Sequence, residues 1–292
     1  MTEKTTHTID APGATITYDV RRNPASSEPP LMLIGSPMGA SGFETLSGHF
    51  TDRTIVTYDP RGAERSTKDD PSTESNPGQH ADDLHRVIEA VGGPVDLFAS
   101  SGGAVNALAL VATYPDDVRI LIAHEPPLAS VLPDADNAKA AVRAIGDSYQ
   151  QRGFGAGMAH FMAVTGHRGE FPDRFAEQPA PDPAQFGMPT EDDGTRNDVM
   201  LYQNIINTTH YQPDFEALRT GPTRIIVAAG EESQGEMANR GAYAVASALG
   251  TEVVVFPSHH GGFLGGEYGW GGQPEAFAAR LREVLSGVPA SA

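Results

Sequence analysis

A serine between a predicted strand and a predicted helix is the strongest candidate for chemistry in this chain. The segment LFASSGGAVNALAL places Ser101 after an apolar run and before a run of small residues. Residues 99–103 read A-S-S-G-G, one change from the pattern G-x-S-x-G. A serine on so sharp a turn has strained backbone geometry, so the residues two before and two after it must be small. Ala99 and Gly103 meet that requirement, and the pattern predicts a nucleophile at Ser101.

Two adjacent histidines are candidates for the base that would activate this serine. His259 and His260 follow the apolar run TEVVVFP in a loop near the carboxyl end. A general base must lie within hydrogen-bond reach of the serine hydroxyl, and a carboxylate must hold its second ring nitrogen. Their positions in the sequence do not decide which of the two histidines is the base.

The elements around these residues alternate between strand and helix, which is typical of a mostly parallel sheet flanked by helices. Residues 14–20 alternate in polarity and predict an antiparallel lead-in strand, whereas the later strands are apolar runs bounded by turn residues. These later strands are predicted at 30–36, 53–59, 94–100, 118–125, 223–230 and 251–257. Helices are predicted at 79–92, 102–114, 236–249 and 274–286.

The alternation stops between about residues 128 and 216, where the pattern is helical. Residues 137–152 and 195–210 are the clearest helical segments, and a loop rich in Pro and acidic residues separates them at 168–194. The simplest division of the 292 residues is one sheet domain, 1–127 and 217–292, interrupted by a helical cap at 128–216.

Composition and charge disfavour several classes of function. The chain has 20 basic and 38 acidic residues and a net charge of −18, which would repel nucleic acid and anionic membranes. Without cysteine, disulfides and thiolate zinc sites are excluded, and no pattern predicts another metal site or a nucleotide cofactor. The first residues, MTEKTTHTIDAPGATI, show no signal pattern, and no apolar run approaches the roughly 20 residues of a membrane span. We therefore expect a cytoplasmic protein without a cofactor.

These features resemble the α/β-hydrolase family over the core, about residues 14–127 and 218–292. The run YDPRGAERS (58–66) resembles the family's D-x-R-G-x-G-x-S turn, with Glu64 in place of a usual glycine. The tripeptide at 260–262, H-G-G, matches the place of the family's histidine. The resemblance implies an α/β-hydrolase fold with a mostly parallel, eight-stranded-type sheet. It also implies that Ser101 is the nucleophile and His260 the base, with His259 as the alternative.

The acid departs from the usual pattern of that family. The expected aspartate would lie three residues beyond Gly230, where this chain has Ser233, although the adjacent Glu231 and Glu232 could substitute through a shifted loop. Zearalenone lactonases and some haloalkane dehalogenases instead carry a glutamate at the end of the strand after the nucleophile helix, and Glu125 stands in that place. A carboxylate at the end of a buried strand is costly without a partner. We expect Glu125 to be the acid, with Glu232 as the alternative.

The resemblance also implies two backbone N–H donors for the oxyanion of a tetrahedral intermediate. The first is Gly102, directly after the serine. The second comes from the loop at 35–43, where Pro37 has no N–H and Met38 is the expected donor. A glycine-rich segment with three aromatic residues, 261–272, follows the candidate base. Two interpretations of this segment stay open, a mobile lid and a packed surface loop.

Together these residues predict a serine hydrolase that cleaves an ester or lactone of a small, apolar molecule through an acyl-enzyme. The expected partner is that small-molecule substrate, and the sequence leaves a homodimer open. The same triad would also suit a cofactor-free haloperoxidase or perhydrolase, a C–C hydrolase or a cyclase. A chain that lacked one triad member could be a ligand receptor on the same fold.

Overall fold

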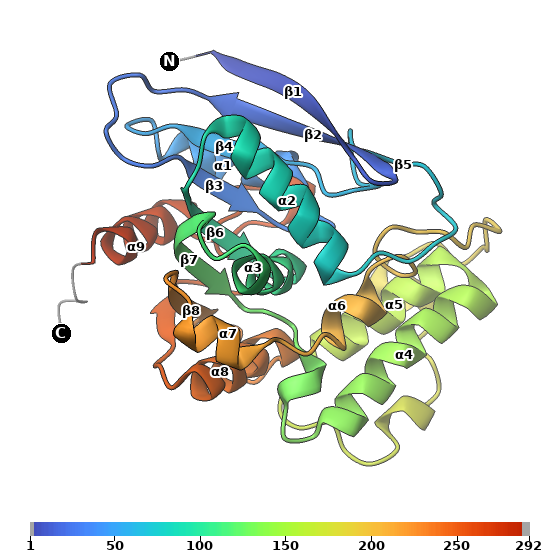
Figure 1. Ribbon diagram of the computed structural model, residues 1–292. Coiled ribbons are helices and arrows are strands. Elements are labelled where there is room, and N and C mark those ends of the chain that lie inside the picture. The colour runs from blue at the N-terminus through green and yellow to red at the C-terminus, as the bar shows by residue number, and fades with distance from the viewer. Residues whose placement is uncertain (1–2, 288–292) are drawn as a thin grey trace.

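A mostly parallel sheet runs through the protein, whose computed structural model describes residues 3–287 (Figure 1). Within these residues the sheet has nine strands. Eight follow one path, in the order β1 (Lys4–Ala11), β2 (Ala14–Arg21), β4 (Ile55–Tyr58), β3 (Leu31–Ile34), β6 (Val95–Ser100), β7 (Val118–His124), β8 (Arg224–Gly230) and β9 (Val254–Phe256). The ninth, β5 (Thr67–Lys68), pairs with β2.

The strand directions agree with the sequence pattern. Strand β2 pairs antiparallel with β1 and β4, whereas the strands from β4 to β9 pair in parallel. The antiparallel lead-in strand at 14–20 and the later parallel strands are therefore confirmed. Strand β1 is absent from the predicted strands because its sequence, KTTHTIDA, is mostly polar and exposed and shows no apolar face.

Helices cover both faces of the sheet, and the residues of β3 alternate between the two. Met32 and Ile34 pack in an apolar cluster with α2 (Pro77–Val91), α3 (Gly102–Thr113) and α8 (Met237–Leu249). Leu31 and Leu33 pack on the other face with α1 (Glu44–Gly48) and α9 (Pro274–Ser286). A strand buried on both faces is expected to be apolar throughout, as β3 is. The four predicted helices of the core agree with α2, α3, α8 and α9 to within two residues at each end.

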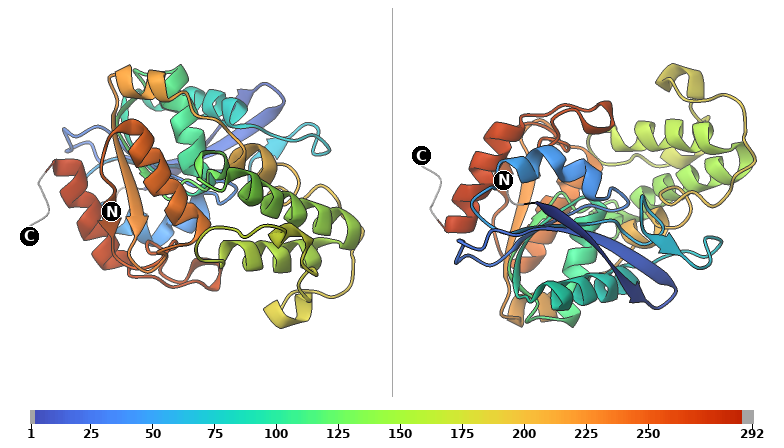
Figure 2. Two further views of the ribbon diagram at one scale, coloured as in Figure 1. Left: turned by 90° about the horizontal axis from the view of Figure 1, so that it is seen from below. Right: turned by 90° about the horizontal axis from the view of Figure 1, so that it is seen from above.

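Between β7 and β8 the chain forms helices that lie beside the sheet. Helices α4 (Ala135–Arg152) and α5 (Phe154–Thr165) extend away from it (Figure 2). They share an apolar cluster of their own, which includes Tyr149, Phe171 and Leu201. The helix predicted at 137–152 is confirmed, and the division into core and cap stays a prediction. None of the helices in residues 3–287 is both long and apolar enough to cross a membrane.

The helix predicted at 195–210 is wrong for most of its length. Only α6 (Ile205–Thr209) is helical there, and residues 199–204 form turns. The Asp198 carboxylate accepts hydrogen bonds from the backbone N–H groups of Met200 and Leu201, at 2.9 and 2.8 Å. A short polar side chain that bonds to nearby backbone in this way favours a turn over a helix. Helix α7 (Phe215–Thr220) then leads into β8.

A buried carboxylate fixes the start of β6, the strand that leads to Ser101. Asp96 is fully buried. It accepts a hydrogen bond from Arg53 at 2.7 Å and two from Arg119 at 2.9 and 2.7 Å. Arg53 is buried as well. Removing one member of a buried ion pair leaves the other charge uncompensated, which destabilises a protein strongly.

We predict that Asp96→Asn lowers the free energy of unfolding by about 3 kcal/mol, because Arg53 would stay buried without a countercharge. Urea unfolding followed by circular dichroism measures this change. Asp116→Asn is a matched control, since Asp116 is exposed, and it should change stability by less than about 0.5 kcal/mol. Equal stabilities for the two variants would show that the buried pair does not support β6.

Candidate active site

Ser101 lies on a sharp turn between β6 and α3. Its φ of 58° and ψ of −127° lie outside the regions that are open to most residues with a side chain. The Ser101 N–H donates to the carbonyl of His124 at 2.9 Å, so the end of β7 supports the turn. A Cβ on Gly103 would come within 2.8 Å of the Gly35 Cα, which explains the need for a small residue two positions after the serine. Ser101 itself stays partly exposed and accessible to a substrate.

The structure joins Glu125 to His260. Glu125 Oε2 lies 2.5 Å from His260 Nδ1. An ionised carboxylate can only accept, so Nδ1 is the donor and Nε2 is left to take up a proton. In the parallel pair β6–β7, Ser100 lies opposite His124, so the residues that follow them, Ser101 and Glu125, lie at the same edge of the sheet.

Uncharged donors surround the other oxygen of the Glu125 carboxylate, which is fully buried. Its Oε1 accepts hydrogen bonds from the Gly230 N–H at 2.9 Å, from the Asn239 amide at 3.3 Å and from the Ser233 hydroxyl. Ser233 occupies the position at which the family pattern places its aspartate. In this chain that position donates a hydrogen bond to the acid.

Burial and hydrogen bonding have opposite effects on the pKa values of Glu125 and His260. Burial raises the pKa of the Glu125 carboxyl, but the hydrogen bond from His260 and the imidazolium charge outweigh it, and the pKa lies well below its ordinary value. Burial lowers the pKa of His260, but the hydrogen bond to Glu125 and its charge outweigh that effect, and the pKa lies above its ordinary value. The site therefore favours the imidazolium–carboxylate pair, the state that forms when His260 takes a proton.

A second histidine packs against the pair as a neutral ring. His124 is fully buried, and its ring lies 6.0 Å from that of His260 with 28° between the planes. Burial lowers the pKa of His124 to about 4, so the ring carries no charge at neutral pH. Its Nδ1 is 3.1 Å from the Ser100 hydroxyl. Sequence reasoning missed His124, although a histidine inside the apolar run VRILIAHE was a signal.

Ser101 and His260 are close to the same strand ends but are not hydrogen-bonded to each other. Within residues 3–287, the His260 ring bonds to Glu125 and not to the Ser101 hydroxyl. The His260 side chain is 37% exposed, so part of the ring is open to solvent. Catalytic hydrogen bonds are often long without substrate and shorten when it binds.

The alternative base, His259, and the alternative acid, Glu232, form their hydrogen bonds with other residues. Both ring nitrogens of His259 engage its own loop, at 3.0 and 3.1 Å. Glu232 is exposed and accepts a hydrogen bond from Gln273 at 3.2 Å. In the part of the chain that the structure describes, neither side chain bonds to Ser101 or His260. The geometry therefore favours His260 and Glu125 over both alternatives.

The loop with the second expected oxyanion donor meets the start of α3 beside this serine turn. Gly102 begins α3, where the first N–H groups have no acceptor within the helix and the helix dipole is positive. A Cβ on Gly102 would come within 2.5 Å of the Ser36 carbonyl oxygen, so the oxyanion loop, residues 35–43, contacts the start of the helix. Within the described residues, the Met38 N–H donates no hydrogen bond. The arrangement can present two N–H groups near Ser101.

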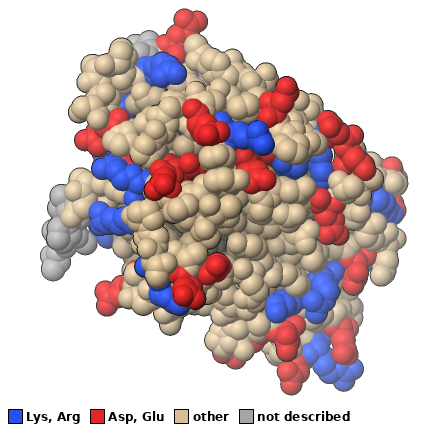
Figure 3. Space-filling view, viewed as in Figure 1, with Lys and Arg blue, Asp and Glu red and all other residues tan. Residues whose placement is uncertain are grey.

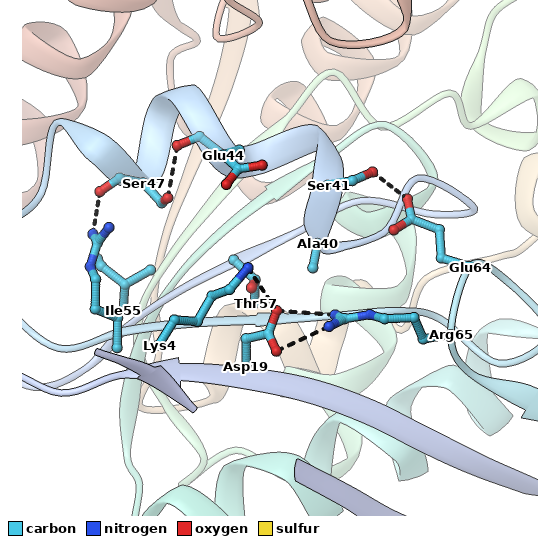
Figure 4. A pocket seen from close by; sticks show the side chains of 11 residues that line it. Lys4, Asp19, Ala40, Ser41, Glu44, Ser47, Ile55, Thr57, Glu64 and Arg65 are labelled. Atoms are coloured by element: carbon cyan, nitrogen blue, oxygen red, sulfur yellow. Dashed lines mark hydrogen bonds and ion pairs between the residues drawn. The ribbon is translucent and has the colours of Figure 1, made fainter. Parts of the chain in front are cut away.

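A charged cavity of about 420 Å³ lies between residues 40–47 and strands β1, β2 and β4 (Figure 4). Its lining includes Lys4, Asp19, Glu44, Glu64 and Arg65, and none of the candidate catalytic residues. Asp19 and Arg65 pair across it at 3.0 Å. The cavity is therefore not where the candidate triad would meet a substrate.

The His260 ring should titrate with a pKa above 6.5, because the Glu125 carboxylate stabilises its protonated form. Glu125→Gln removes that charge and should lower the pKa of His260. Nuclear magnetic resonance titration of the histidine ring protons measures it, with Glu232→Gln as the control that leaves the pKa unchanged. A His260 pKa that is indifferent to Glu125→Gln would contradict the assignment of this pair.

Comparison with known proteins places this chain in a family. The Alpha/beta hydrolase family pattern matches residues 31–280. The chain is 30% identical over 263 residues to the uncharacterized hydrolase YraK of Bacillus subtilis strain 168, covering 88% of this chain and 89% of YraK. The fold is similar to a thermophilic esterase from Thermogutta terrifontis, with a TM-score of 0.65 and 18% identity over 98% of this chain and 99% of that one. It is also similar to the carboxylesterase CesB from Bacillus subtilis, with a TM-score of 0.61 and 16% identity over 98% and 93% of the two chains.

The solved structures show the fold, and the family match covers most of the chain, including the turn at Ser101 and the loop at His260. The expected α/β-hydrolase fold is therefore confirmed. This chain belongs to the alpha/beta hydrolase family and is a hydrolase.

Proposed function

We propose that this hydrolase cleaves a carboxylic ester or lactone of a small, apolar molecule through an acyl-enzyme, with Ser101, His260 and Glu125 as its triad. The observation on which the proposal rests is the 2.5 Å hydrogen bond between Glu125 and His260, at the sheet edge where Ser101 lies. The names of two similar structures, an esterase and a carboxylesterase, support the choice of an ester bond.

In the first half of the reaction the Ser101 hydroxyl attacks the acyl carbon. His260 Nε2 takes the serine proton, and Glu125 holds the resulting imidazolium through Nδ1. The carbonyl oxygen becomes negative, and the N–H groups of Gly102 and Met38 stabilise it. His260 then donates its proton to the departing alcohol oxygen, the C–O bond breaks, and the acyl group stays on Ser101.

In the second half a water molecule replaces the alcohol. His260 takes a proton from the water, which attacks the acyl carbon of the serine ester. The same two N–H groups stabilise the second tetrahedral intermediate. His260 returns its proton to the Ser101 oxygen, and the carboxylic acid leaves. With a lactone, the alcohol and the acid are parts of one product.

The charge of the protein supports an uncharged substrate. The net charge of −18 disfavours anionic molecules near the surface. On the face shown in Figure 3, Lys and Arg lie scattered among Asp and Glu, with broad uncharged areas between them. In the oxyanion loop, the Met38 side chain packs between Gly35 and Gly42 and offers an apolar surface beside the expected oxyanion donor.

Kinetics with a chromogenic short-chain ester test this proposal. Ser101→Ala should lower kcat by at least about 10⁴, because the nucleophile is lost. Glu125→Gln should lower kcat on the order of 10³ or more, because the imidazolium loses its partner. Glu232→Gln is the matched control, an exposed glutamate one loop away, and should keep the wild-type kcat.

Two results would count against the proposal. Wild-type turnover by Ser101→Ala would remove the nucleophile assignment. A large loss in Glu232→Gln with little loss in Glu125→Gln would move the acid to the later loop. Circular dichroism of each variant shows whether a loss of activity reflects a loss of fold.

A further inference from the structure

Glu64 is the residue at which this chain departs from the glycine of the family's D-x-R-G-x-G-x-S turn. Its φ is 46°, a left-handed conformation that glycine adopts readily and that is strained for a residue with a side chain. The turn has therefore kept the backbone shape that suits glycine while gaining a carboxylate. Strain of this kind persists only where surrounding contacts hold it.

One oxygen of that carboxylate makes all of its hydrogen bonds to two other loops. Glu64 Oε1 accepts the Gly39 N–H at 3.2 Å, the Ser41 hydroxyl at 2.6 Å and the Tyr268 hydroxyl at 2.7 Å. Gly39 and Ser41 belong to the oxyanion loop, one and three residues after Met38. A Cβ on Gly39 would come within 2.8 Å of the Glu64 carboxyl carbon, so the contact is close. Figure 4 shows the Ser41–Glu64 bond at the rim of the charged cavity.

Tyr268 belongs to the aromatic loop, residues 261–272, which directly follows His260. It too has a positive φ, 57°, and the residue is 58% exposed. Burial of its hydroxyl and the neighbouring Glu64 charge raise the pKa of Tyr268 to about 12, so it stays a hydrogen-bond donor. A second contact holds the aromatic loop in place, because the Glu267 carboxylate accepts a hydrogen bond from the Thr45 N–H at 2.9 Å.

We propose that Glu64 is a positioning residue that joins the oxyanion loop to the aromatic loop, and so holds the Met38 donor and the His260 loop in one geometry. The Glu64 cluster is defined as Glu64, Ser41 and Tyr268. Its role in the reaction rests on the proposed function. Transition-state donors must be held to within a fraction of an ångström, and the cluster fixes the backbone next to one of them. The aromatic loop is thus a docked surface loop, with the Glu64 cluster at its exposed end.

Glu64→Gly tests the cluster without a cost to folding, because glycine suits the φ of 46°. We expect an unchanged or higher Tm, a kcat about tenfold lower and a KM close to that of wild type, because the lost contact positions a transition-state donor. Tyr268→Phe should lower kcat by a similar factor. The Tyr268 hydroxyl bonds to Glu64 and also lies 2.6 Å from the Ser41 hydroxyl, so both changes disrupt one hydrogen-bonded cluster. The double variant should therefore lose no more kcat than the single variant with the larger loss.

Two further variants separate positioning from charge. Glu64→Gln keeps an acceptor oxygen at Oε1 and should retain kcat within about threefold of wild type. Glu44→Gln removes a neighbouring exposed carboxylate that lines the same cavity and has no bond to either loop among the described residues, and it should behave as wild type. A tenfold loss in Glu44→Gln would mean that local charge matters and the cluster does not.

The fluorescence of Trp270, the single tryptophan, reports on the aromatic loop without a measurement of enzyme activity. It lies two residues after Tyr268 and is 58% exposed. Release of the aromatic loop in Glu64→Gly or Tyr268→Phe should lower the anisotropy of Trp270 fluorescence and increase its quenching by acrylamide. Unchanged fluorescence together with unchanged kcat would overturn the proposal, as would losses that multiply in the double variant. If the wild type cleaves no ester, the proposed function fails, and the fluorescence alone then decides whether Glu64 joins the loops.

Discussion

The geometry of the site depends on one constraint, the burial of the Glu125 carboxylate. A buried carboxylate without partners would take up a proton or destabilise the fold. Here one oxygen bonds to His260 and the other to three uncharged donors, from Gly230, Ser233 and Asn239. These donors come from the end of β8, the loop after it and α8, so the acid ties those elements to β7. The position of His260 follows from the direction in which that carboxylate points.

Backbone strain is concentrated around the same site. Among the described residues, six non-glycine residues have a positive φ. They are Glu64, Ser101, Glu125, Arg174, Ser258 and Tyr268. Five of these, all except Arg174, belong to the turn of the proposed nucleophile, the proposed acid, the loop of the proposed base or the Glu64 cluster. Strained conformations tend to occur where the surrounding structure holds a functional geometry, and this distribution agrees with an active site at the carboxyl edge of the sheet.

Features with a local cause were predictable from the sequence. The turn at Ser101 depends on small neighbours, and the parallel strands depend on short apolar runs, so both could be seen in a few residues. Glu125 was expected as the acid through the resemblance to hydrolases that carry a glutamate at this strand end, and a charge at the end of a buried strand also requires a partner. The exposed strand β1 was not, since it has no apolar face, and the helix expected at 195–210 failed because the Asp198 side chain stabilises a turn instead.

Long-range hydrogen bonds set the limit of such prediction. Ser233 and Asn239 support the acid across more than 100 positions of sequence, and Tyr268 meets Glu64 across 204. No local pattern encodes which loop a carboxylate will meet, because that depends on how the finished sheet brings its loops together. The sequence shows that Glu64 replaces the usual glycine of its motif, and only the fold shows that it contacts the oxyanion loop.

The most direct test of the account is the site at which a fluorophosphonate reacts. The reagent forms a stable bond only with a nucleophile that a neighbouring base has activated. Mass spectrometry of the labelled, digested protein should find one adduct, on the peptide that contains Ser101, and Ser101→Ala should carry none. A wild type that stays unlabelled, or an adduct that persists in the alanine variant, would contradict the central claim.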